Sequence, residues 1–381
     1  MDQTLTEALV RWRRHLHAHP EPSLHEHDTA AFVCARLGEL GVPCVPGVGG
    51  TGVVATLRRG SSNRSVGLRA DMDALLIAEE TGLPYASTRP GVMHACGHDG
   101  HTASLLGAAA LLARDRDWSG TVHFVFQPAE EGFGGARTMM QDGLFERFPM
   151  ERIFGWHNWP GLDAGTVAVH AGPVMAAAAR VGIAIEGHAA HAAMPHLARD
   201  PMLTAAHLLI ALQSVVSRGV DPLASAVLSI CVVEGGAAAN QIPSRAVMRG
   251  TFRSHDPAVR DTVEQGIHRI TAGIAQAFGT PAAVEVRHTA VATVNDPAVA
   301  ALAAETAGGL GLPVRRNLPP SMAAEDFGWY LTEKPGAFVW IGNGPATPGC
   351  ELHNPGYDFN DAVLPHAATW LATVAKRALA G

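Results

Sequence analysis

The sequence predicts an α/β protein of two domains, the larger built on a mostly parallel sheet and the smaller inserted into it. The chain of 381 residues is longer than one hydrophobic core usually spans, so two domains are expected. Its first half alternates short apolar runs with helical stretches, which is typical of a parallel sheet covered by helices. Near residue 176 this alternation gives way to a different order of elements.

The strands of the larger domain are expected where short apolar runs end in polar residues. Four runs have this form and predict buried strands at 65–71, 120–131, 152–158 and 336–344. In an open parallel sheet, the carboxyl ends of the strands form the edge at which ligands bind. The polar residues that close these runs are therefore the first candidates for a functional site.

The smaller domain is best defined by its helix at 256–279. Asp256 is a suitable N-cap, and Pro257 suits the first helical position. Apolar residues then recur at spacings of four and three along one stripe: Val259, Val263, Ile267, Ile270, Ile274 and Phe278. In strands, by contrast, the alternation has a period of two, as in 245–254.

The elements after residue 177 follow the order of a known small domain. They are predicted as strand 180–187, helix 200–218, strands 225–236 and 245–254, helix 256–279 and strand 282–289. This βαββαβ order is that of the split-βαβ, ferredoxin-like sandwich. We therefore expect a domain of residues 178–290 inserted into a larger domain made of 1–177 and 291–381.

Composition excludes several classes of partner. The formal charge of −7 and the lack of a Lys/Arg block argue against nucleic acid or an anionic membrane as partner. No run reaches the ~18 apolar residues of a membrane span, and the amino-terminal segment lacks the apolar stretch of a signal peptide. The five cysteines are scattered and odd in number, which does not suggest a disulfide framework. A cytoplasmic location is the simplest expectation.

Metal-binding residue types gather at the ends of the predicted strands. Asp71 closes one strand, Glu130 and Glu131 close another, and His157 closes a third. The segment HACGHDGH, residues 94–101, places Cys96 and His98 just before a helix. Side chains from four stretches should thus converge on one edge of one sheet.

Thiolate, imidazole and carboxylate are the ligands of zinc and of neighbouring divalent transition metals. Of two adjacent glutamates, one can coordinate while the other stays free as a general base. A metal ion lowers the pKa of a bound water from ~15.7 towards ~7, and the free carboxylate moves its proton during attack on a carbonyl. A purely structural zinc site would fill its positions with closely spaced Cys and His and would need no spare glutamate.

Other features have simpler interpretations. Taken alone, Glu130 and Glu131 could be an acidic pair at a helix start, and Asp73 is expected to be structural. A second histidine patch flanks a helix end without strand-end carboxylates, so no metal role is predicted for it: His15, His17, His19, His25 and His27. The thiols of Cys34, Cys44 and Cys231 are expected to be ordinary buried or peripheral groups.

Eight segments carry a family resemblance. They are RRHLHAHPEPSLHE, GLRADMDALLIAEETGLPYAS, MHACGHDGHTA, FVFQPAEEGFGGARTMM, GWHNWPGLDAGTVAVHAGPVMAAA, HAAMPH, GGAAANQIPSRAVMRGTFRS and ELHNPGYDF. Together and in this order, they resemble the metal-dependent aminoacylase and carboxypeptidase superfamily, and most closely its amidohydrolase branch. That branch holds hippurate hydrolases, N-acyl-amino-acid amidohydrolases, N-acetyldiaminopimelate deacetylases and auxin-conjugate hydrolases. The resemblance implies a metallopeptidase-like catalytic domain with an inserted lid or dimerisation domain.

The resemblance also implies roles for individual residues. The ligands of two divalent metal ions would be Cys96, His98, Glu131, His157 and His353. Glu130 would be the general base, and Asp71 would orient the metal site. His353 is implied by the resemblance alone, because its spacing from the other ligands carries no signal.

Three residues of the inserted domain match substrate-contacting positions of the family. His191 matches a histidine that polarises the scissile carbonyl, often across a dimer, and Asn240 and Arg253 match residues that hold the substrate's carboxylate or carbonyl oxygen. By itself, Arg253 would be read as a solvated strand residue. Whether His191 acts within its own chain or on a partner stays open.

Two departures from the wider superfamily affect the metal. Arg69-Ala70-Asp71 stands where carboxypeptidase relatives carry His-x-Asp, and Cys96 replaces their bridging aspartate. Both changes are shared by the amidohydrolase branch. Zinc, manganese, nickel and cobalt all suit such a mixed S/N/O site, so the identity of the metal stays open.

The expected function is hydrolysis of the amide bond of an N-acyl amino acid, of the hippurate or N-acetyl type, to a carboxylate and a free amino acid. A metal-activated water and the general base Glu130 would carry it out. The partners expected are a small-molecule substrate and a second copy of the chain, in a homodimer or larger homo-oligomer. Two alternatives remain at this point: a dipeptidase or carboxypeptidase of the same superfamily, and a non-catalytic metal-binding interaction protein.

Overall fold

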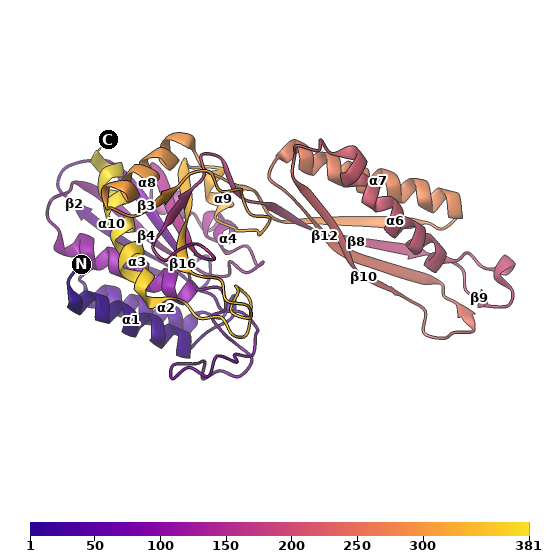
Figure 1. Ribbon diagram of the computed structural model, residues 1–381, viewed down its shortest axis with the longest axis horizontal. Coiled ribbons are helices and arrows are strands. Elements are labelled where there is room, and N and C mark those ends of the chain that lie inside the picture. The colour runs from indigo at the N-terminus through magenta and orange to yellow at the C-terminus, as the bar shows by residue number, and fades with distance from the viewer. Residues whose placement is uncertain (381) are drawn as a thin grey trace. The chain divides into compact units, whose positions relative to one another are not determined.

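The fold is described from a computed structural model, in which residues 1–380 are described. The chain divides into two compact units (Figure 1). The first unit consists of Met1–Val174, Val294–Pro320 and Asp326–Gly381. The second unit consists of Met175–Thr293 together with the short segment Ser321–Glu325.

The first unit is built on an eight-stranded sheet with the order β1-β2-β4-β3-β5-β16-β6-β15. Its four middle strands, β4, β3, β5 and β16, run parallel to one another, whereas β1, β2 and β6 pair antiparallel. The strands are β1 (Cys44–Val48), β2 (Gly52–Arg59), β3 (Ser65–Asp71), β4 (Gly120–Gln127), β5 (Arg152–Pro160), β6 (Val167–Val169), β15 (Val314–Arg315) and β16 (Gly336–Gly344). The prediction of an α/β fold with a largely parallel central sheet is confirmed.

Helices cover this sheet, and the most deeply buried of them is α3 (His98–Arg114). It packs between α1 (Gln3–Ala18) and α10 (Leu364–Ala380), because its small residues allow close approach. A Cβ at Gly107 would lie 2.8 Å from a methyl of Leu9 and 2.9 Å from Ala368. The remaining helices of this unit are α2 (His27–Glu39), α4 (Gly135–Gln141), α5 (Leu144–Arg147), α8 (Pro297–Gly309), α9 (Gly328–Leu331) and the 3-10 turn η2 (Asp361–Val363).

One strand ends earlier than the sequence predicted. The strand expected over 120–131 stops at Gln127, and the chain then turns. Pro128 has no N–H to continue the ladder, and Ala129 adopts a positive φ of 54°, which is uncommon for a residue with a side chain. Glu130 and Glu131 therefore lie in a turn beyond the sheet rather than on the strand itself.

The second unit is a four-stranded antiparallel sheet in the order β10-β12-β8-β13. Because β12 lies between β8 and β10, the β8-α6-β10 crossover is split, as the βαββαβ order predicted. Apolar side chains from α6 and α7 pack on the sheet around Ile183, Met248 and Phe252. The elements are β8 (Ala177–Glu186), α6 (Pro201–Gly219), β10 (Ala226–Gly235), β12 (Arg245–Ser254), α7 (Pro257–Phe278) and β13 (Ala282–Ala290).

Short elements complete the chain. β9 (Ala190–His191) pairs with β11 (Gln241–Ile242), and the 3-10 turn η1 (Pro195–Leu197) follows β9. β7 (Pro173–Met175) and β14 (Thr293–Val294) lie where the chain passes from one unit to the other. Among the helices of residues 1–380, none combines the length and the apolar character that crossing a bilayer requires.

Candidate metal centre

The predicted metal ligands of the first unit come together beyond the carboxyl ends of the parallel strands. Cys96 and His98 stand at the start of α3, where Gly97 is the N-cap with a φ of 88°. Glu131 lies in the turn after β4, His157 lies near the end of β5, and His353 lies in the loop before α10. A Cβ at residue 97 would lie 2.3 Å from Asn158 Nδ2, so only glycine fits between these two ligands.

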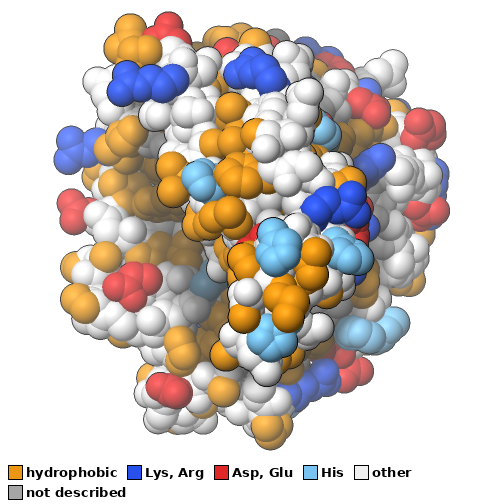
Figure 2. All heavy atoms as spheres, turned by 90° about the vertical axis from the view of Figure 1, so that its right-hand side faces the viewer, with side chains coloured by type: hydrophobic (Ala, Val, Ile, Leu, Met, Phe, Trp, Pro, Cys, Tyr) orange, Lys and Arg blue, Asp and Glu red, His pale blue; other side chains and the backbone are white. Residues whose placement is uncertain are grey.

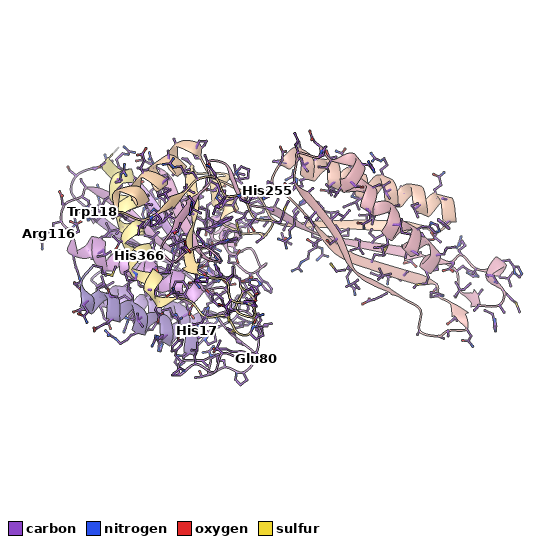
Figure 3. All side chains as sticks on the ribbon, in the orientation of Figure 1. His17, Glu80, Arg116, Trp118, His255 and His366 are labelled. Atoms are coloured by element: carbon purple, nitrogen blue, oxygen red, sulfur yellow. The ribbon has the colours of Figure 1, made fainter. Side chains whose placement is uncertain are left out.

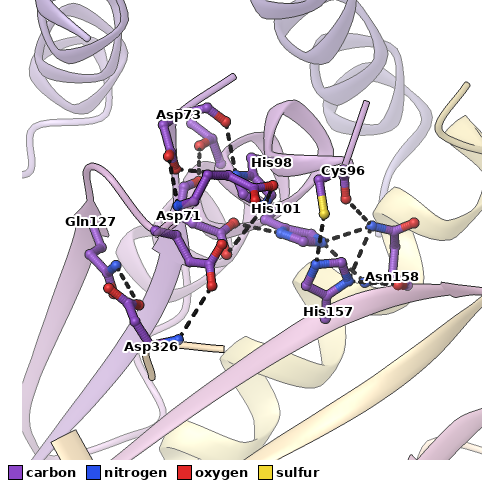
Figure 4. Close-up of polar contacts among 12 residues, drawn as sticks. Asp71, Asp73, Cys96, His98, His101, Gln127, His157, Asn158 and Asp326 are labelled. Atoms are coloured by element: carbon purple, nitrogen blue, oxygen red, sulfur yellow. Dashed lines mark hydrogen bonds and ion pairs between the residues drawn. The ribbon is translucent and has the colours of Figure 1, made fainter. Parts of the chain in front are cut away.

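The ligand atoms form two groups that share one sulfur. Cys96, His98 and His157 place one candidate atom each within 4.8 Å of the others, and so do Cys96, Glu131 and His353. Cys96 Sγ lies 3.4 Å from His157 Nε2, as Figure 4 shows, and His353 Nε2 lies 3.2 Å from Glu131 Oε1. A thiolate common to both groups is the arrangement that a pair of neighbouring cations would use.

Unpartnered atoms in the cluster test whether a metal fits. His98 Nδ1 lies 2.8 Å from the backbone oxygen of Asp73, which leaves Nε2 to face a metal ion. That Nε2 is buried, has no hydrogen-bond partner of normal geometry, and lies 4.0 Å from Glu131 Oε1. Buried polar atoms of this kind need a partner, and the mixed S/N/O donor set suits a divalent transition metal. The residues present therefore fit the predicted cations.

The pKa values of the predicted ligands also agree with a metal site. Burial and the neighbouring Glu131 raise the pKa of the Cys96 thiol. Burial also holds the pKa of His157 well below its usual value, which keeps this imidazole neutral. Hydrogen bonds to Cys96 and Glu131 raise the pKa of His353 to about 10. Because Cys96 must lose its proton to bind a metal, cation binding should release protons from this cluster.

Asp71 lies at the end of β3 within a fully buried ionic network. Its Oδ2 accepts a hydrogen bond of 2.8 Å from Arg69 Nη1 and lies 3.8 Å from His98 Nε2, while Oδ1 lies 2.6 Å from His101 Nδ1. Burial opposes ionisation, but His98 and Arg69 outweigh it and hold the pKa of Asp71 well below its usual range. A permanent carboxylate is thus fixed behind the histidines of the cluster.

A chain of hydrogen bonds through Asn158, which the sequence did not predict, supports the segment that carries Cys96. The backbone N–H of Asn158 donates to His101 Nε2 at 3.0 Å, and its side-chain amide donates to the Cys96 carbonyl at 2.6 Å. The Tyr357 hydroxyl donates to Asn158 Oδ1 at 2.6 Å. His101, Asn158 and Tyr357 all lie within the segments that carry the family resemblance, but no role was predicted for any of them.

The turn that carries the two glutamates is held by buried acidic residues. Asp73 Oδ2 accepts a hydrogen bond of 3.0 Å from the backbone N–H of Glu131. The backbone N–H of Asp326 donates to Glu130 Oε1 at 3.3 Å, and Gln127 fixes Asp326 with a 2.8 Å hydrogen bond. Glu130 is only partly buried, and its carboxylate lies in one group with His98 and Glu131. Asp326 was not suspected from the sequence.

One histidine of the amino-terminal patch supports the start of α3. His17, on α1 (Figure 3), is buried with Nδ1 2.8 Å from Asp99 Oδ2 and Nε2 3.3 Å from Glu79 Oε1. Burial opposes protonation, but the two carboxylates outweigh it and raise the pKa of His17 to about 9. This ion pair joins α1 to the residue that follows His98, so the structure gives His17 carboxylate partners that the sequence did not reveal.

The three predicted residues of the second unit do not form one cluster within that unit. The backbone oxygen of Asn240 accepts from Ala192 N–H at 3.0 Å, so Asn240 lies beside His191. Both residues are exposed. Figure 2 shows histidine and apolar side chains close together on the face toward the viewer. Arg253 lies near the opposite end of β12, where Nη1 donates to the Met322 oxygen at 3.2 Å.

Comparisons with known proteins place this arrangement among hydrolases. The model of a family described as "Peptidase family M20/M25/M40" matches residues 67–377. The chain is 42% identical to N-acetyl-L-cysteine deacetylase of Bacillus subtilis over 99% of this chain and 89% of that protein. It is 41% identical to hippurate hydrolase of Campylobacter jejuni over 96% of this chain and 95% of that protein.

A solved structure agrees with these sequence matches. It is a Bacillus subtilis protein described as a dinuclear metal binding peptidase from the M20 family, with a TM-score of 0.88 and 35% identity. The match covers 100% of this chain and 99% of that one. The resemblance inferred from the eight sequence segments is thereby confirmed.

Proposed function

The chain belongs to peptidase family M20/M25/M40, and on this premise we propose how its residues act in the reaction. The protein is a metal-dependent amidohydrolase that cleaves the amide bond of N-acyl amino acids. We propose N-acetyl and benzoyl groups as acyl groups, since the relatives are named for N-acetylcysteine and hippurate. The observation that supports the site assignment is the pair of ligand groups that share Cys96.

We assign the metal ligands to Cys96, His98, Glu131, His157 and His353, and the general base to Glu130. Bound divalent ions would polarise the acyl carbonyl and favour ionisation of the attacking water. Glu130 takes the proton of that water and returns it to the leaving nitrogen. Its turn position supports this role, because Glu130 is only partly buried and its carboxylate lies in one group with His98 and Glu131. Asp71 keeps the histidines oriented.

The residues of the second unit suggest that the enzyme works as a homodimer. Between Arg245 and Arg253, β12 extends by about 27 Å at ~3.4 Å per residue. His191 and Asn240 lie near one end of this strand and Arg253 near the other, so one small substrate cannot touch both ends of a single copy. We propose that Arg253 binds the substrate's carboxylate while His191, with Asn240 beside it, polarises the scissile carbonyl, and that these two groups at one substrate come from different copies of the chain.

We place this pairing at the β10 edge of the second sheet. Strand β10 pairs with β12 on one side, and in residues 1–380 no strand pairs with its other side. Apolar side chains along and near this edge are exposed, including Val227, Val233 and Ile210. Exposed strand edges of this kind invite pairing with another chain. Light scattering that gives the mass of a monomer at working concentrations would contradict the dimer.

We also propose a cytoplasmic location. The support is chemical: the five cysteines of the chain are free, and the metal centre depends on a reduced Cys96. A reducing compartment preserves such thiols. Fractionation of producing cells tests the assignment, and recovery of the active enzyme outside the cytoplasm would contradict it.

The function is tested by measuring release of free amino acid from hippurate and N-acetylcysteine. Wild-type enzyme should turn over at least one of them, lose activity with a chelator, and recover with Zn²⁺, Mn²⁺, Ni²⁺ or Co²⁺. Glu130→Gln should keep the metal content of the wild type and lose about 10²–10⁴-fold in kcat. Chelator-resistant turnover would contradict the metal assignment, and full activity of Glu130→Gln would contradict the assignment of the base.

A further inference from the structure

We propose that Glu26 is a positioning residue, whose buried carboxylate holds the turn that presents Glu130 to the substrate. Glu26 stands directly before α2 and is fully buried. It lies more than one hundred residues away along the chain from the turn, with which it makes a direct hydrogen bond. The inference rests on the proposed role of Glu130 as general base.

The contacts of Glu26 divide between its two oxygens. Oε1 accepts a hydrogen bond of 2.8 Å from the backbone N–H of Ala129 and one of 3.1 Å from Leu24 N–H. Oε2 accepts one of 2.5 Å from the hydroxyl of Thr51. The first oxygen therefore binds the residue that precedes the general base, while the second fixes the carboxylate from behind.

Ala129 needs such a support because of its backbone conformation. Its φ of 54° lies in the left-handed region, which costs an alanine roughly 1 kcal/mol or more. A glycine would adopt this conformation without that cost. The Glu26 carboxylate offers the Ala129 N–H a charge-assisted hydrogen bond only while the residue keeps this turn.

A second buried carboxylate holds the other side of the same turn. Asp73 Oδ2 accepts from Glu131 N–H at 3.0 Å and from the Ser23 hydroxyl at 2.6 Å. The backbone N–H groups on both sides of Glu130 thus donate hydrogen bonds to buried carboxylates. Each of these carboxylates also accepts a hydrogen bond from a hydroxyl group of another segment. Without Glu26, Ala129 would relax towards an ordinary φ and Glu130 would shift relative to Glu131.

The test compares kcat, KM and metal content across five variants on hippurate or N-acetylcysteine, whichever is turned over. Glu26→Ala should lower kcat about 10²-fold, the loss expected from a displacement near 1 Å, with little change in KM. Glu26→Gln keeps an oxygen that can accept from Ala129 N–H and should restore most of kcat. The double variant Glu26→Ala with Ala129→Gly should also recover kcat, because glycine adopts the turn unaided.

Thr51→Val is the matched control. It removes a hydrogen bond to the same carboxylate and should lower the thermal unfolding midpoint, but it leaves the Ala129 contact in place and should lower kcat far less than Glu26→Ala does. The proposal is overturned if folded Glu26→Ala keeps wild-type kcat, or if Thr51→Val lowers kcat as much. It is also overturned if glycine at 129 gives no rescue. Glu130→Gln, measured in parallel, reports separately on the base itself.

Discussion

The metal centre of the first unit and the candidate substrate residues of the second differ in how firmly they are held. Cys96, His98 and His157 are buried, and each imidazole has its second nitrogen fixed by a backbone oxygen. His191 and Asn240 are exposed, and their side chains have few partners within their own unit. The candidate centre is preorganised by the fold, whereas the exposed side chains of the second unit are not held in this way.

This difference separates two kinds of defect. A change in the metal centre removes a ligand from a network in which the atoms depend on one another, so metal binding and turnover should fail together. A change on the second unit should leave the metal in place and affect turnover or substrate affinity alone. Three substitutions, from the largest expected effect to the smallest, test this separation, and a fourth tests an ion pair that stabilises the first unit.

Loss of the shared sulfur should have the largest effect. Cys96→Ala removes the atom common to both ligand groups, and we expect it to lose bound metal and about 10³-fold in kcat/KM. Cys96→Asp is the control, because a carboxylate can also bridge two cations. Elemental analysis of metal per chain measures the first effect. An alanine variant with full metal content would show that metal binding does not depend on the shared sulfur.

Substitution of His191 should have the next largest effect. His191→Ala should lower kcat about 10²–10³-fold and leave the metal content unchanged. If the partner's His191 serves the site, mixing this variant with Glu130→Gln should regain part of the wild-type turnover. In the mixed dimer, one site then has both an intact Glu130 and an intact His191 from the partner. Mixtures that stay inactive after subunit exchange would place His191 in the same chain as its site.

Arg253→Ala should mainly weaken substrate binding. A charge-assisted hydrogen bond to a carboxylate is worth about 1.5–3 kcal/mol, so we expect KM to rise roughly 10- to 100-fold with kcat less affected. Arg253→Lys keeps the charge but not the planar pair of donors and should restore only part of the affinity. If KM is unchanged while kcat falls, Arg253 belongs to the chemical step instead.

The smallest effect concerns stability in the first unit. The folded protein raises the pKa of His17 to about 9, above the value near 6.5 of an unfolded chain. The Asp99 and Glu79 contacts therefore stabilise the fold fully below pH ~6.5, and this contribution is lost as the pH rises through about 9. This contribution to the free energy of unfolding is on the order of 3 kcal/mol. Thermal unfolding of wild type and His17→Gln should differ most near pH 6 and converge above pH 9, and a constant difference would contradict the ion pair.

Much of the fold could be predicted because the signals are local. Apolar runs located the middle strands of the first sheet, and the Asp256-Pro257 start with its apolar stripe located α7. The end of β4 was misjudged because the polar and apolar pattern continues to Glu131, while a proline and a positive φ end the ladder at Gln127. Backbone conformation of this kind leaves only a weak trace in the sequence.

The candidate site, like the fold, contains some residues that the sequence marks locally and others that it does not. His98 and Glu131 could be chosen from the sequence because each stands in a cluster of metal-binding residue types at a strand or helix end. His353 came only from resemblance, since it is alone in its loop and its φ of 65° is not encoded by a glycine. Asp326 carries no local signal, and Tyr357 lies within a resemblance segment without a predicted role, so only their contacts with Gln127 and Asn158 reveal what they do.

The sequence by itself determined the family and the fold class and predicted the candidate ligand types and the two-domain division, because residue chemistry and apolar periodicity are local properties of the chain. The tertiary structure decided which buried carboxylates support which ligands. Hydrogen bonds link Glu26 to Ala129 across 103 residues and Asp71 to His101 across 30 residues. Such pairs are selected by the packing of strand ends and helix starts at one sheet edge, where a buried polar group must find a partner whatever its position in the sequence.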